Sequence, residues 1–122
     1  MPSSKDIRYK FYFRPGYGSD KMLIEFFYGA EKEEFLPDFL DAIESLNPKI
    51  ESTLDLWMND EIQLSIHSDL GDFSLSKDTW GFAFLWNDNH QCVVKKLSDL
   101  LAGDSRFEKV EVDFDKYKKP LS

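Results

Sequence analysis

His67, His90 and Cys92 are the only histidines and the only cysteine in this chain. The two histidines lie far apart in the sequence and no second cysteine exists, so the clustered ligands typical of a zinc site are missing. Cys92 falls near the predicted start of a helix, where a thiolate is favoured. An isolated helical cysteine is nevertheless most often a small apolar side chain. We therefore predict no metal site and no cofactor.

Carboxylates are the commonest reactive groups, with 23 Asp and Glu residues in total. A catalytic pair of acids requires one member whose pKa is raised by burial. Asp55 comes nearest, between Leu54 and Leu56, but the alternation of the strand predicts an outward position for it. No GxSxG elbow, Walker loop or GxGxxG is present, and no helical pattern follows Gly16-Tyr17-Gly18. These absences predict a protein that is not an enzyme.

The net charge narrows the choice of partner. Fifteen basic residues against 23 acidic ones give −8, and residues 1–115 alone, with 12 basic residues, carry −11. A field of this sign repels duplex nucleic acid and anionic membranes and attracts basic proteins. Acidity is also common and keeps small proteins soluble, so the charge by itself does not require a specific partner.

One stretch could bind single-stranded nucleic acid. Arg8, Lys10, Tyr12 and Arg14 place basic and aromatic side chains on one predicted strand, where bases could stack. The acidity of the remaining chain argues against this use. We predict neither nucleic acid nor membrane as a partner.

Length and composition predict one domain spanning residues 1–122, with mobile tails at 1–6 and 116–122. The single cysteine forbids an internal disulfide and favours a reducing compartment. The first residues lack the apolar segment of a signal peptide, and no apolar run reaches the roughly 20 residues of a membrane span. We therefore predict a cytoplasmic protein that is a monomer or weak dimer.

Apolar periodicity defines the elements that would position these residues. Period-2 alternation predicts strands at 7–13, 21–28, 53–58, 61–67, 72–76, 80–86 and 109–114. Apolar residues at spacings of three and four predict helices over 36–46 and from about 90 to Gly103. The order ββ-α-ββββ-α-β indicates an α+β fold. We expect one antiparallel sheet of six to seven strands with both helices on one face.

The other face would be open, or half covered by the N-terminal hairpin. Alternation predicts that it carries Asp55, Trp57, Glu61, Gln63, His67, Asp72 and Ser74. A Trp among acids there either anchors a partner or lies under the hairpin. In the strand 80–86, the four aromatics Trp80, Phe82, Phe84 and Trp86 alternate with smaller residues. We expect the aromatic side chains to point into the core. If the smaller side chains point inward instead, the aromatics form an exposed ladder suited to binding.

Two stretches stand out in this part of the chain, Asp69-Leu70-Gly71-Asp72-Phe73 and Trp80-Gly81-Phe82-Ala83-Phe84. With its single acidic α+β domain and surface aromatics, the chain resembles the small immunity proteins of bacterial toxin systems, such as contact-dependent growth inhibition pairs. The resemblance implies a protein that binds one cognate toxin, commonly a basic nuclease, and blocks its active site. It implies no catalytic residues.

The predicted partner contacts lie on the outward face and its turns. They are Asp55, Trp57, Glu61, Asp69, Asp72 and Asp78. Acidic side chains there would attract a basic protein and aromatic side chains would anchor it. The alternative is a small regulatory or ligand-binding module, which would have an apolar pocket between sheet and helix.

Overall fold

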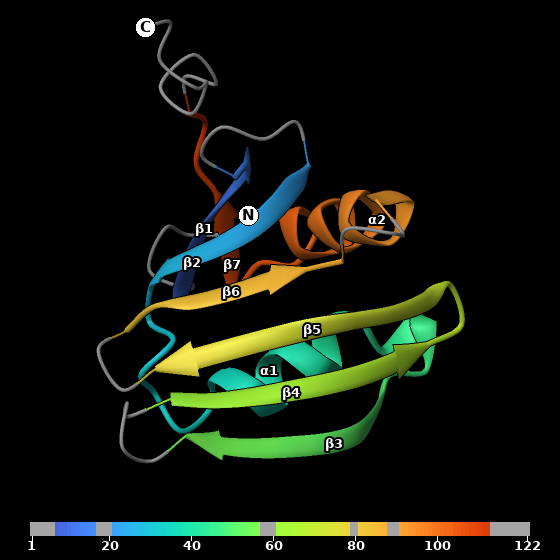
Figure 1. The fold of residues 1–122 in the computed structure, drawn as a ribbon. Coiled ribbons are helices and arrows are strands. Elements are labelled where there is room, and N and C mark those ends of the chain that lie inside the picture. Colours follow the sequence, from blue (N-terminus) through green and yellow to red (C-terminus); the bar gives the residue numbers. More distant parts are fainter. Residues whose placement is uncertain (1–6, 17–20, 57–60, 79–80, 88–90, 113–122) are drawn as a thin grey trace, which may run out of the picture.

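The computed structural model describes residues 7–16, 21–56, 61–78, 81–87 and 91–112, which form one seven-stranded sheet and two α-helices (Figure 1). The strands are β1 (Tyr9–Pro15), β2 (Met22–Tyr28), β3 (Lys49–Leu56), β4 (Glu61–Ser68), β5 (Gly71–Asp78), β6 (Ala83–Trp86) and β7 (Phe107–Lys109). The helices are α1 (Phe35–Ala42), the 3₁₀ turn η2 (Glu44–Leu46) and α2 (Gln91–Ala102). The predicted α+β class and element order are confirmed.

The strands lie in the order β3-β4-β5-β6-β2-β1-β7, so the N-terminal hairpin is part of the sheet and does not cover its face. Every neighbouring pair is antiparallel except β1 and β7, which are parallel. The closing strand comes earlier than predicted because the buried Phe107, ahead of the apolar alternation, packs its ring against Tyr9 and Phe26.

Both helices lie on the same face of the sheet, behind it in Figure 1. The core between them is aromatic: Phe26 on β2 contacts Phe35 and Phe39 of α1 edge to face. Pro37 occupies the first turn of α1, where its missing N–H is harmless. The predicted helix 36–46 is divided in two, since α1 ends at Ala42 and a 3₁₀ turn follows.

The phase of β6 is the reverse of the predicted one. Ala83 and Leu85 are fully buried on the helix side, while Phe84 and Trp86 are partly exposed on the other. Leu85 lies between Ile24 of β2 and Leu75 of β5, both buried, so the smaller side chains of β6 complete the core. Phe82, just before this strand, is also exposed, at 42%. The prediction that the aromatics fill the core was therefore wrong for Phe82, Phe84 and Trp86, and Trp80 lies outside the described residues.

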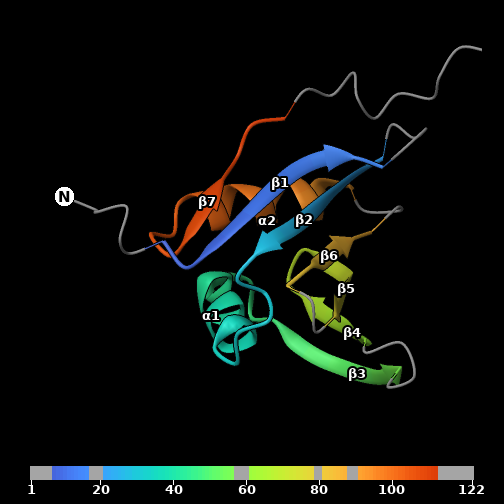
Figure 2. The ribbon, with the colours of Figure 1, turned by 90° about the vertical axis from the view of Figure 1, so that its left-hand side faces the viewer.

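The phase of β3 also differs from the prediction. Leu56 pairs with Glu61, and this register places Leu54 opposite Gln63 and Asp55 opposite Ile62. Directly paired antiparallel residues share a face, so Leu54 lies outward and Asp55 lies on the helix side. The predicted core position of Leu54 was wrong, and this side chain is 55% exposed. Asp55 is exposed too, because β3 extends beyond the helix layer (Figure 2).

A network of hydrogen bonds and ion pairs connects α1 to the edge of the sheet formed by β1 and β7. The buried Tyr9 on β1 donates its hydroxyl to Asp38 of α1 at 2.7 Å. Arg106, just before β7, contacts Asp38 at 3.2 Å and both Asp41 and Asp104 at 2.8 Å. Burial, then the hydrogen bond to Asp38, raises the pKa of Tyr9, while the hydrogen bond from Arg106 lowers the pKa of Asp104.

Replacing Asp104 should alter the acid stability of the fold. Because its pKa is lower in the folded state, its stabilisation is present above the ordinary aspartate value of about 3.9 and is lost as the pH falls below it. Asp104→Asn should therefore reduce the free energy of unfolding at neutral pH and flatten its decline below about pH 5. Urea unfolding across this range measures both effects; an unchanged slope would contradict the role of Asp104.

A second prediction concerns Ser98 of α2. Its hydroxyl is fully buried and has no partner among the described residues. Ser98→Ala removes an unsatisfied polar group and should raise the free energy of unfolding by about 1 kcal/mol. The exposed Ser105→Ala is the control and should change it by less than about 0.5 kcal/mol. A loss of stability in Ser98→Ala would reveal a hydrogen-bond partner for this hydroxyl.

Candidate functional site

The face of the sheet opposite the helices is the candidate site, and we call it the open face. Cross-strand pairing assigns side chains to it row by row. One row runs Leu54–Gln63–Ser76–Phe84–Glu25–Tyr12 across β3, β4, β5, β6, β2 and β1. The next row runs Ser52–Ser65–Ser74–Trp86, and His67 and Asp72 lie in a third. Glu61 and Asp78 form a fourth row at the opposite end.

Aromatic rings occupy the centre of the open face. Phe84 and Trp86 are partly exposed, and their partners on β5 are the small Ser76 and Ser74. Next to them, Tyr12 and Phe27 stack with ring centroids 4.2 Å apart. Serine side chains are too short to cover a neighbouring ring, so the rings remain available. Partly exposed aromatics of this kind supply large apolar contact area at protein interfaces.

An ion pair lies beside the ring of Phe84. The Nε atom of Arg14 donates to Glu25 at 2.6 Å, and Nη1 donates to the carbonyl oxygen of Pro15 at 2.9 Å. The two side chains are only 7% and 17% exposed, and the guanidinium lies 6.0 Å from the centroid of Phe84. The charge of Arg14 is thus used within the protein.

The other two cations of the predicted first strand, Arg8 and Lys10, also lie close to carboxylates. Arg8 lies 3.2 Å from Asp38, and Lys10 lies 3.8 Å from Glu108. The stretch that could have bound single-stranded nucleic acid therefore carries paired charges, and its Tyr12 is stacked on another ring. These contacts remove much of the positive surface that phosphate binding requires.

Acidic groups flank the aromatic centre at both ends. At one end, Glu61 and Asp78 are cross-strand partners. The carboxylate of Glu61 accepts hydrogen bonds from the hydroxyl of Ser76 and, at 3.4 Å, from the amide of Gln63. Ser76 is itself the partner of Phe84, so this anchored carboxylate lies beside the aromatic centre.

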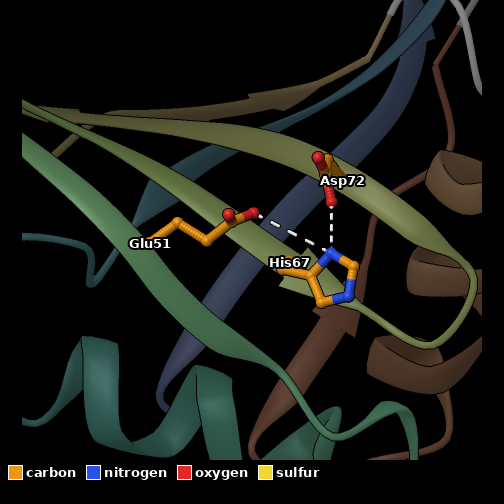
Figure 3. A group of neighbouring side chains, drawn as sticks. All are labelled: Glu51, His67 and Asp72. Atoms are coloured by element: carbon orange, nitrogen blue, oxygen red, sulfur yellow. Dashed lines mark hydrogen bonds and ion pairs between the residues drawn. The ribbon is translucent and has the colours of Figure 1, made fainter.

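At the other end, Glu51, His67 and Asp72 converge from three adjacent strands (Figure 3). The Nδ1 atom of His67 lies 2.6 Å from Asp72 Oδ1 and 3.8 Å from Glu51 Oε1. A bulge between Ile50 and Ser52 leaves Glu51 without a direct partner on β4 and lets its side chain reach His67.

The structure disperses the six predicted contact residues. Glu61 and Asp78 are together, but Asp72 lies six residues along β5 from Asp78, about 20 Å away. Asp69 occupies the turn between β4 and β5 and accepts a hydrogen bond from Asn47 at 2.7 Å. Asp55 lies on the helix side, which corrects its predicted outward position. Trp57 lies outside the described residues.

Phe84, Trp86 and Glu51 lie on the open face but were not among the predicted contacts. Phe84 and Trp86 were assigned to the core, although the smaller residues alternating with them allowed the reverse phase. Glu51 reaches the open face only through the bulge of β3, and no sequence pattern marks that bulge.

A shallow depression of about 280 Å³ lies near the β7 edge of the sheet, lined by Ile7, Lys10, Tyr28 and Glu108. Two of these four residues form an ion pair with each other. The alternative prediction of a ligand module required an apolar pocket between sheet and helix. This depression does not lie between sheet and helix, and its lining includes two charged side chains.

Comparisons of this chain with protein-family models, with curated proteins and with solved structures found no match. Among the described residues, neither helix has the length and apolar character of a membrane span.

The ion pair between Arg14 and Glu25 yields a stability prediction. Arg14→Met leaves Glu25 charged and mostly buried, so the free energy of unfolding should fall by about 3 kcal/mol. Arg8→Met, which breaks an ion pair whose arginine is 54% exposed, should cost less than about 1 kcal/mol. Denaturant unfolding measures both.

The double variant Arg14→Met/Glu25→Leu removes both charges and should recover most of the stability lost in Arg14→Met. A double variant as unstable as the single one would show that the unpaired charge of Glu25 is not the cause of the loss.

Proposed function

We propose that this protein is a cytoplasmic binding protein of the immunity type, which holds a basic partner protein on the open face of its sheet. The observation that carries the proposal is the position of Phe84 and Trp86. Both rings are partly exposed at the centre of a sheet face that lies opposite the two helices. A partner that covers these rings gains their apolar area.

The arrangement of charge supports a basic partner. Glu61 and Asp78 lie beyond Phe84 at one end of the face, and the group around Asp72 lies beyond Trp86 at the other. Such a layout has an apolar centre and a charged periphery, as in many protein interfaces. The peripheral acids would accelerate encounter with a cationic protein, and the rings would supply most of the affinity.

The resemblance to immunity proteins makes the proposal more specific. A basic nuclease uses cationic side chains to bind the phosphates of its substrate. Carboxylates on the face of another protein can bind those cationic side chains instead. On this proposal, the open face covers the toxin's active site and excludes its substrate. The surplus of acid over base in residues 1–115 supports a partner of opposite charge.

Partner capture with matched variants tests the proposal. The tagged full-length chain is used to capture proteins from its native host, and the captured basic protein is then purified. Trp86→Ala should weaken binding of that protein by at least about thirtyfold, the loss expected when an interface anchor is truncated. Isothermal titration calorimetry measures the affinity.

Charge reversal separates the open face from general acidity. Glu61→Lys/Asp78→Lys should weaken binding and flatten its dependence on salt. Glu33→Lys/Glu44→Lys makes the same charge change at exposed residues outside the open face and is the control. Equal losses in the two double variants, or unchanged affinity in Trp86→Ala, would refute binding through the open face.

A further inference from the structure

The group formed by Glu51, His67 and Asp72 combines an imidazole with two carboxylates, and no other group of this kind occurs among the described residues. Each residue offers one ligand atom, one imidazole nitrogen and two carboxylate oxygens, and these atoms lie within 4.8 Å of one another. They come from β3, β4 and β5, so three strands of the sheet fix their backbones (Figure 3). Nitrogen and oxygen donors in this combination suit borderline transition-metal ions better than Mg²⁺ or Ca²⁺.

The distances between the ligand atoms of Glu51, His67 and Asp72 fit a metal ion after small side-chain movements. Ligands at 2.0–2.1 Å from a tetrahedral ion are about 3.3 Å apart. The observed separations from His67 Nδ1, 2.6 Å to Asp72 and 3.8 Å to Glu51, lie on either side of that value. All three side chains are more than half exposed, so they can adjust without disturbing the core.

Three contacts or features of the strands support this convergence. His67 and Asp72 are direct cross-strand partners, which keeps their side chains on one face of the sheet. Glu51 is the extra residue of the β3 bulge, and bulges commonly redirect a side chain toward a site. The side-chain amide of Asn87 also donates to the carbonyl oxygen of Asp72 and ties this strand to the end of β6.

One neighbouring charge opposes a cation here. Lys49 is the partner of His67 on β3 and is exposed. Two carboxylates outweigh one ammonium group, and an exposed lysine can turn into solvent. The net charge of the group therefore still favours a divalent cation.

We propose that Glu51, His67 and Asp72 bind one divalent transition-metal ion, with Zn²⁺ the best match to these donors. In the metal-free structure Nδ1–H of His67 donates to the carboxylate of Asp72 at 2.6 Å. On metal binding this proton leaves Nδ1 for solvent, and the neutral imidazole that binds through Nδ1 carries its proton on Nε2. The fourth coordination position points away from the sheet and is open to water or to a donor atom of another molecule.

Calorimetric titration of the chelator-treated, full-length protein with ZnCl₂ tests the site. The expected result is saturable binding of one ion per chain. His67→Ala should weaken it by at least about tenfold, and Glu51→Gln/Asp72→Asn should also weaken it. In thermal unfolding, added Zn²⁺ should raise the Tm of the wild type more than that of either variant, since an ion that binds only the folded state raises its stability.

His90→Ala is the matched control, because the chain has only these two histidines. It should leave Zn²⁺ affinity unchanged, and excess Mg²⁺ should not displace Zn²⁺. Three results would overturn the site: no saturable binding, equal affinity in wild type and His67→Ala, or loss of binding in His90→Ala alone. None of these measurements involves the partner protein, so the site and the proposed function are tested separately.

Discussion

A single layer of helices covers one face of a seven-stranded sheet, and the other features of this protein follow from that constraint. The buried aromatics of β1 and β2 meet α1 and β7 on that side, where Phe26 contacts Phe35, Phe39 and Phe107. Side chains on the opposite side have no helix layer to bury them. They must therefore be polar, satisfy one another, or remain available to a second molecule.

The open face shows all three solutions. Serines of β4 and β5 are polar and small, while Arg14 and Glu25 satisfy each other beside the ring of Phe84. Phe84 and Trp86 represent the third solution, since neither serves the core and neither is fully covered. Exposing large rings in the middle of a sheet is unfavourable in isolation, and burial by a partner would remove that cost.

In the proposed interface, charge is secondary to the aromatic centre. The acids of the described residues do not form one continuous patch, because they lie at both ends of the open face, in the turn at Asp69 and on the helix side at Asp55. Several others are already paired with Arg8, Lys10, Arg14 or Arg106. The aromatic centre, which gives contact area, and the acids at its ends, which give orientation, together define the proposed interface.

By itself the sequence determined the element types and their order, since periods of 2 and 3.6 are local properties that side-chain alternation reveals. It also determined the excess of acid and the scarcity of histidine and cysteine. Only the tertiary structure decided which face of β6 turns inward, because Phe84 and Leu85 are both apolar and the choice depends on Ile24 and Leu75 on neighbouring strands. The same holds for Glu51, whose approach to His67 depends on a bulge in strand pairing, and pairing is a long-range property that no local pattern encodes.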